Sequence, residues 1–158
     1  MTTPITFRAL TCDDLPTVKQ IIDETEMFPS EMLDEMTAPF FDHTNSDNED
    51  LWFVACSDQP VAIAYCAPER MTDGTWNLLL IAVSPKCQGL GVGKKFMVFL
   101  EQQIQNIPGR ILLVETSGLP EFAITRNFYP QCGYTQVACI PDFYEAGDDK
   151  IVFLKKLT

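Results

Sequence analysis

Histidine is nearly absent from this sequence, and no two cysteines form a Cys-x-x-Cys pair. The single histidine, His43, lies in a polar stretch with acidic neighbours and is interpreted as a surface side chain without a functional role. A structural zinc site requires closely spaced cysteine and histidine ligands, so we expect the protein to bind no metal. Most of the six cysteines lie in or beside apolar runs, where a reduced thiol packs as a small hydrophobic group.

The sequence also lacks a long hydrophobic run. No segment approaches the roughly 18 apolar residues that a membrane-spanning helix needs, and residues 1–4 lack the basic and apolar regions of a signal peptide. Hydrophobic residues make up 46% and charged residues 21% of the 158 positions, as is typical of a globular protein. We therefore expect one cytoplasmic domain over residues 1–158, with no membrane partner.

Positive charge is scarce as well. Lysine and arginine number 11 against 22 aspartate and glutamate residues, so the net charge is −11. Such a surface repels the phosphates of nucleic acid, and we expect no nucleic-acid partner. An acidic protein attracts a cationic acceptor such as an amine, but acidity more often serves only solubility, so net charge alone selects no substrate.

Glycine is concentrated in one place, between an apolar strand and an amphipathic segment. The run Gln88-Gly89-Leu90-Gly91-Val92-Gly93 does not fit the dinucleotide fingerprint, because Lys94 stands where the third glycine is required. It does not fit the P-loop either, because Lys95 stands in place of the serine or threonine. Glycines let the backbone approach a phosphate, and the start of a helix presents free N–H groups, so the run predicts an anion-binding loop.

The spacing that does fit is Gln/Arg-x-x-Gly-x-Gly/Ala, following a strand and a Ser84-Pro85 turn. This segment resembles the acetyl-CoA loop of the GNAT superfamily of N-acetyltransferases. The resemblance implies acetyl-CoA as co-substrate and assigns contacts with its pantetheine arm to the backbone of Ile81, Ala82 and Val83. It assigns the pyrophosphate contacts to Gln88, Gly89, Leu90, Gly91, Val92, Gly93 and Lys94.

Hydrophobic periodicity and turn residues predict elements in the order β-α-α-β-β-β-α-β-α-β-β. Asp13 is expected to cap the first helix, Pro39 to lie beyond the end of the second, and 141–149 to form an acidic loop. The order is that of the GNAT fold over essentially the whole chain. The resemblance therefore implies a mixed α/β fold, with a mostly antiparallel twisted sheet and a splayed parallel strand pair. Strands are expected at residues 6–10, 51–56, 61–67, 78–83, 110–116, 134–140 and 150–157, and helices at about 13–26, 29–38, 92–107 and 120–129.

Acetyl transfer to an amine requires two proton movements. A substrate ammonium, whose ordinary pKa is about 10.4, must lose a proton, and the departing thiolate, with a pKa near 8.5, gains one. The segment 126–134 resembles the family's Tyr-x-x-x-Gly-Phe/Tyr motif, whose tyrosine lies near the thioester sulfur, so Tyr129 is the candidate general acid. Glu115 ends an apolar strand where some GNAT members have a glutamate, and it is the candidate base. Other members carry a carboxylate on the preceding strand, where this chain has Asn77, which leaves Glu115 or a water relay.

The acceptor is expected to meet residues 27–31 and the late segment 140–145, which resembles that of small bacterial-type GNAT proteins with uncharacterised acceptors. The candidate acceptor contacts are Phe28, Asn77, Phe143 and Tyr144. The predicted function is direct transfer of an acetyl group from acetyl-CoA to a primary amine within a ternary complex. The alternatives are an acyl-CoA-binding or sensing module with little turnover, and a nucleotide-binding signalling domain. A homodimer is an expectation from the family only.

Overall fold

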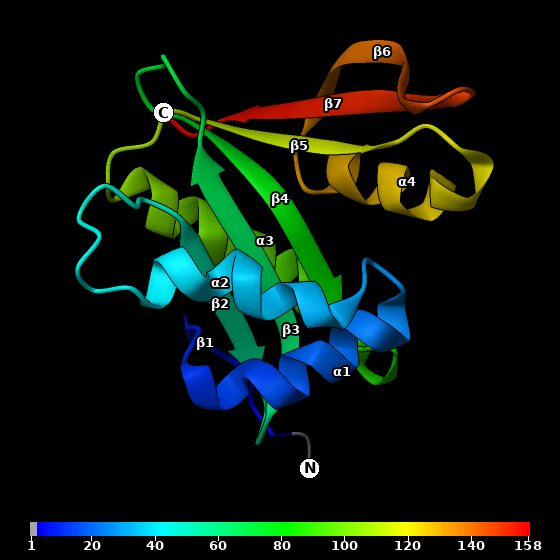
Figure 1. The fold of residues 1–158 in the computed structure, drawn as a ribbon. Coiled ribbons are helices and arrows are strands. Elements are labelled where there is room, and N and C mark those ends of the chain that lie inside the picture. The colour runs from blue at the N-terminus through cyan, green and yellow to red at the C-terminus, as the bar shows by residue number, and fades with distance from the viewer. Residues whose placement is uncertain (1–2) are drawn as a thin grey trace. The chain divides into compact units, whose positions relative to one another are not determined.

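The structure, a computed structural model, describes residues 3–158, and its strands and helices follow the predicted order (Figure 1). The seven strands form one sheet in the order β1-β2-β3-β4-β5-β7-β6, mostly antiparallel, with β4 and β5 parallel. The predicted fold class is therefore confirmed. Among these residues, no helix has the length and apolar character needed to cross a bilayer. The strands are β1 (Thr6–Ala9), β2 (Leu51–Cys56), β3 (Pro60–Pro68), β4 (Thr75–Val83), β5 (Ile111–Ser117), β6 (Thr135–Glu145) and β7 (Asp148–Lys156), and the helices are α1 (Leu15–Thr25), α2 (Leu33–Phe41), α3 (Val92–Gln105) and α4 (Ala123–Gln131).

The chain forms two compact units, and the first contains the described residues up to Ala67 together with Leu80–Phe99. Both faces of its sheet carry packed side chains. Side chains alternate along a strand, so neighbouring residues of β2 pack on opposite faces. Trp52 and Val54 of β2 are fully buried in a core shared with α1 and α2, which cross in front of β2 and β3 in Figure 1. Phe53 points the other way, and its ring centroid lies 5.1 Å from that of Phe99 on α3.

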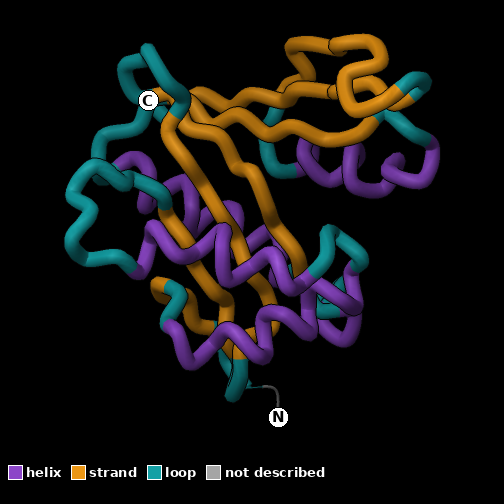
Figure 2. Tube along the Cα trace, in the orientation of Figure 1, coloured by secondary structure: helices purple, strands orange, loops and turns teal. Residues whose placement is uncertain are grey.

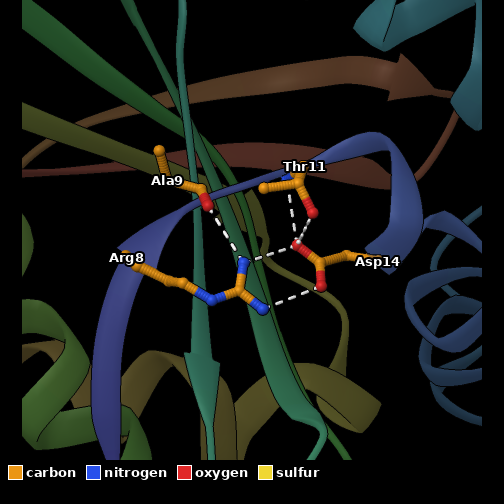
Figure 3. A network of polar contacts seen from close by, with 4 residues as sticks. All are labelled: Arg8, Ala9, Thr11 and Asp14. Carbon is orange, nitrogen blue, oxygen red and sulfur yellow. Dashed lines mark hydrogen bonds and ion pairs between the residues drawn. The ribbon is translucent and has the colours of Figure 1, made fainter.

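A network of polar contacts fixes the start of α1 (Figure 3). The carboxylate of Asp14 accepts hydrogen bonds from the backbone N–H of Thr11 at 2.9 Å and from both terminal nitrogens of Arg8 at 2.6 and 2.8 Å. The predicted Asp13 cap is wrong. A short 3₁₀ turn over Cys12–Asp14 precedes α1, and Asp14 holds the position before the helix. Its carboxylate makes no capping hydrogen bond to α1 and accepts instead from the N–H of Thr11, the residue before the turn.

Acidification is expected to weaken folding through Asp14. The Arg8 guanidinium lowers the pKa of this carboxyl to about 2, with help from Thr11 and against the opposing effect of burial. Because the folded pKa is depressed, the stabilisation is complete above the unfolded value of about 3.9 and is lost as the pH falls through the folded value. The expected loss is about 2 kcal/mol in the free energy of unfolding between pH 4 and pH 2.

Urea unfolding of the wild type and of Asp14→Asn across pH 2–6 measures this contribution. The difference in unfolding free energy between the two proteins should shrink as the pH falls below 4. A constant difference over this range would show that Asp14 has the same pKa in both states.

The second unit contains Pro68–Leu79 and Leu100–Thr158. In it β5 pairs in parallel with β4 from Thr75↔Ile111 to Leu78↔Val114, and antiparallel with β7. Val114 lies opposite Phe153, and Glu115 lies opposite Val152. Because neighbouring residues on a strand point to opposite faces, Val114 and Glu115 lie on different faces of this part of the sheet. The predicted splay of β4 and β5 beyond this register stays a prediction.

The segment 141–149, predicted as an acidic loop, is mostly strand. β6 continues to Glu145 and β7 begins at Asp148, so the two form a long hairpin with a short turn at Gly147 (Figure 2). Two acidic side chains of this hairpin stabilise it by accepting hydrogen bonds from its own backbone. Asp149 accepts a hydrogen bond from the N–H of Asp142, and Asp142 accepts one from the N–H of Gly147.

Two prolines also lie near the C-terminal ends of helices. Pro39, expected beyond the end of α2, lies within it, and Pro130 lies within α4. The fixed φ of proline is compatible with helical geometry, and near the end of a helix only one hydrogen bond to an earlier carbonyl is lost. Accordingly, α2 ends two residues after Pro39, and α4 ends one residue after Pro130.

Candidate functional site

The glycine-rich loop lies in the first unit, between the end of β4 and the start of α3. Gly89 has φ +78° and Gly91 has φ +82°, a left-handed conformation that other residues adopt only with strain. A Cβ added at either position would meet no atom within 4 Å. Glycine is therefore needed here for its backbone conformation, and the space in front of both residues is open.

The start of α3 follows the loop directly and carries hydrogen-bond donors. The N–H of Lys95 donates to the carbonyl of Gly91 at 3.1 Å, which is the first bond of the helix. The N–H groups of Val92, Gly93 and Lys94 precede it and so have no acceptor within the helix. Together with the exposed Lys94 and the positive end of the helix dipole, they fit an anionic group such as a pyrophosphate.

Gln88 stabilises the loop from within. Its side-chain Nε2 donates to the carbonyl of Val83 at 3.0 Å, which links the loop to the last residue of β4. Ala82 is buried in the core with α1, whereas Ile81 and Val83 are partly exposed and Leu90 is exposed. Of the residues assigned to the pantetheine arm, Ile81 and Val83 thus have accessible atoms, while Ala82 packs inward.

A buried amide joins two carboxylates in the second unit. Asn77, only 3% exposed, donates from Nδ2 to Oε1 of Glu69 at 2.8 Å and to Oε1 of Glu115 at 2.9 Å. The other carboxylate oxygen of Glu115 forms an ion pair with Nζ of Lys150 at 2.7 Å, and the two side chains are 23% and 13% exposed. The candidate base therefore has two partners. Within residues 3–158, no group of three or more His, Cys, Asp or Glu side chains could hold a metal ion.

Two of the predicted acceptor contacts lie beside this cluster. Lys150 Nζ is 4.0 Å from the ring centroid of Phe143, and the rings of Phe143 and Tyr144 meet edge to face. Burial raises the pKa of Tyr144, as do the charges of Glu115 and Asp148. Phe143, Tyr144 and Asn77 thus lie around the pair of Glu115 and Lys150, and their contact with the acceptor stays a prediction. Phe28 belongs to the first unit, where it packs against the hydrophobic core.

Tyr129 lies on the face of the sheet opposite Glu115. It is buried on α4, and its ring centroid lies 5.6 Å from that of Phe153, whose neighbour Val152 pairs with Glu115. Burial raises the pKa of Tyr129 well above its usual value, and the nearby Cys132 adds to this effect. The phenol therefore remains protonated throughout the physiological pH range, as a proton donor must.

Sequence reasoning missed Glu69 and Lys150. Glu69 is placed by the turn between β3 and β4, where its N–H donates to the carbonyl of Thr75 at 2.8 Å. Lys150 reaches Glu115 because it pairs with Ser117 on β5, two positions along the same face. Neither residue belongs to a motif. Only the alternation of side chains along β7, combined with its pairing register, would have placed Lys150 beside Glu115.

Comparison with known proteins agrees with this architecture. An uncharacterised N-acetyltransferase of Methanocaldococcus jannaschii is 33% identical over 86 residues, a match covering 52% of this chain and 53% of that protein. The chain thus spans about half the length of this curated relative.

Solved structures match over nearly the whole chain. A structure from Desulfovibrio desulfuricans, assigned to the GNAT family of acetyltransferases, is 28% identical with a TM-score of 0.90, covering 98% of this chain and 100% of that one. An aminoglycoside 6'-N-acetyltransferase in complex with coenzyme A shares the fold at 14% identity, with a TM-score of 0.77 and 97% of each chain covered. The acetyltransferase (GNAT) domain family matches residues 47–136, more than half of the sequence, so this chain belongs to the GNAT family of acetyltransferases.

Proposed function

We propose that this protein transfers an acetyl group from acetyl-CoA to a primary amine, directly and within a ternary complex. Family membership supports acetyl transfer, and the observation that carries the choice of donor is the glycine loop. Its open space, its free helix N-terminal N–H groups and Lys94 suit the pyrophosphate of CoA. We further propose that residues 1–158 act as one domain, since β4 and α3 each contribute residues to both units.

The proposed roles of the side chains follow from their charge and surroundings. Bound acetyl-CoA supplies a thioester carbonyl for attack and a thiol as leaving group. Tyr129 donates its phenolic proton to the departing sulfur. Glu115 accepts the proton that the attacking amine loses, directly or through a water molecule. Before it can accept this proton, the Glu115 oxygen that now pairs with Lys150 must leave that ammonium and contact the acceptor amine.

The ion pair between Glu115 and Lys150 also favours a second candidate function, an acyl-CoA-binding module with little turnover. In that case the ion pair between Lys150 and Glu115 persists when CoA binds, and Glu115 does not act as a base. The two functions share the same CoA site and differ only in whether thiol is released from acetyl-CoA in the presence of an amine.

Thermal unfolding with CoA, ATP and NAD tests the donor site. A ligand at one hundred times its Kd adds about 2.7 kcal/mol of stability, which for a chain of this size raises Tm by roughly 5–10 °C. We expect CoA to produce this rise and ATP and NAD to produce much less. A larger rise with ATP or NAD would indicate a nucleotide-binding domain, and no rise with CoA would show that the glycine loop has been misassigned.

A further inference from the structure

The amide oxygen of Asn77 is buried and has no hydrogen-bond partner among residues 3–158. Its nitrogen already uses both hydrogens, one on Glu69 and one on Glu115. The amide cannot be reversed, since its oxygen would then face two carboxylates that have no proton to offer. Buried carbonyl oxygens are rarely left unpaired, so this oxygen indicates a missing donor beside the two carboxylates.

The charges around this oxygen are unbalanced. Glu69 and Glu115 contribute two negative charges, and Lys150 contributes one positive charge through its ion pair with Glu115. Within the described residues, the carboxylate of Glu69 has no ion-pair partner. A ligand that both donates a hydrogen bond and carries one positive charge therefore completes the cluster, whereas a water molecule supplies only the hydrogen bond.

The chain itself shows how an ammonium is held at this place. The Nζ of Lys150 lies 2.7 Å from a carboxylate oxygen of Glu115 and 4.0 Å from the ring centroid of Phe143. A carboxylate together with an aromatic ring is a typical arrangement for organic ammonium groups. A divalent metal ion is disfavoured, because within residues 3–158 no group of three or more His, Cys, Asp or Glu side chains could hold one.

We propose that Glu69 and the amide oxygen of Asn77 bind an alkylammonium group of the acceptor, next to the ammonium of Lys150. Carboxylates raise the pKa of a bound amine, so a nitrogen held here keeps its proton and is not the nucleophile. The acceptor therefore carries a second amino group, which makes it a diamine or polyamine. The identification of this ligand as the acceptor rests on the proposed function, whereas ammonium binding at the cluster does not.

Calorimetric titration of 1,4-diaminobutane into the CoA-saturated protein tests the site. We expect binding to weaken by about tenfold in Glu69→Gln, which keeps an acceptor for Asn77 but loses the charge. Glu121→Gln, at an exposed position, removes the same charge elsewhere and should bind within about twofold of the wild type. Lys150→Met should bind more tightly, because it removes the competing ammonium from Glu115.

Three results would overturn the proposal. Equal affinities of Glu69→Gln and Glu121→Gln would mean that net charge alone attracts the diamine. No binding by the wild type would mean that water completes the cluster, and displacement of the diamine by millimolar Mg²⁺ would identify a metal site. CoA affinity is measured in the same samples, so a protein that binds the diamine but not CoA contradicts the proposed function and leaves the ammonium site intact.

Discussion

Replacing Tyr129 with phenylalanine is expected to slow thiol release from acetyl-CoA by about a hundredfold or more. The ring of Tyr129 is buried against Phe153, and phenylalanine keeps this ring. The variant therefore retains the packing of the second unit and loses only the hydroxyl group that donates the proton. A thiolate that leaves without a proton donor raises the barrier of the step in which the C–S bond breaks. The affinity for CoA should stay within about twofold, because the proposed pyrophosphate donors belong to the glycine loop.

Tyr65→Phe is the matched control. Its hydroxyl donates to Asp50 at 2.9 Å in the first unit, so this variant also loses one phenolic hydrogen-bonding group from a partly buried ring. It should retain wild-type turnover in an assay of thiol release with an amine present. If Tyr129→Phe turned over as fast as Tyr65→Phe, Tyr129 would be a packing residue. Turnover by neither the wild type nor any variant, with CoA binding retained, would favour the binding module.

A methyl group at Gly91 is expected to weaken CoA binding by tenfold or more. Alanine at φ +82° costs roughly 1–2 kcal/mol, and its Cβ extends into open space beside the proposed pyrophosphate site. Either the loop changes conformation to relieve the strain, or the methyl group occupies the position of the ligand. Calorimetric titration with CoA measures the loss of affinity, and thermal unfolding measures the strain.

The chain provides a control with the same strain and no ligand. Gly147, in the turn between β6 and β7, has φ +86° and equally open space around its Cβ position. Gly147→Ala should lower Tm by an amount similar to that of Gly91→Ala, while binding CoA as the wild type does. Equal CoA affinities for the two variants would mean that Gly91 serves only the backbone conformation of the loop.

Much of the fold could be predicted because its signals are local. The apolar runs 51–56 and 78–83 and the glycine loop lie where periodicity and turn residues indicate. Predictions failed where a local signal met a tertiary contact. The acids of 141–149 suggest a loop, but Asp142 and Asp149 accept backbone N–H groups and so support a hairpin. Prolines near the ends of α2 and α4 are tolerated for a similar reason, since packing outweighs one lost hydrogen bond.

The polar cluster could be predicted only in part. Glu115 and Asn77 stand on apolar strands, where a polar residue is conspicuous. Glu69 and Lys150 belong to polar stretches that suggest exposure. The turn between β3 and β4 places Glu69, and the pairing of β7 with β5 places Lys150. An amide accepts no proton, so the sequence excludes Asn77 as a base and gives it no other catalytic role. The structure shows it as the donor that connects two carboxylates.

The separation of Tyr129 from Glu115 by the sheet has an evolutionary consequence. The phenol is carried by α4 on one face, while the other face is lined from the β6–β7 hairpin by Phe143, Tyr144 and Lys150. Exposed hairpins tolerate substitution and changes in length well. Descendants of this chain can therefore acquire new acceptors by altering the hairpin, while α4 and the proposed proton donor Tyr129 stay unchanged.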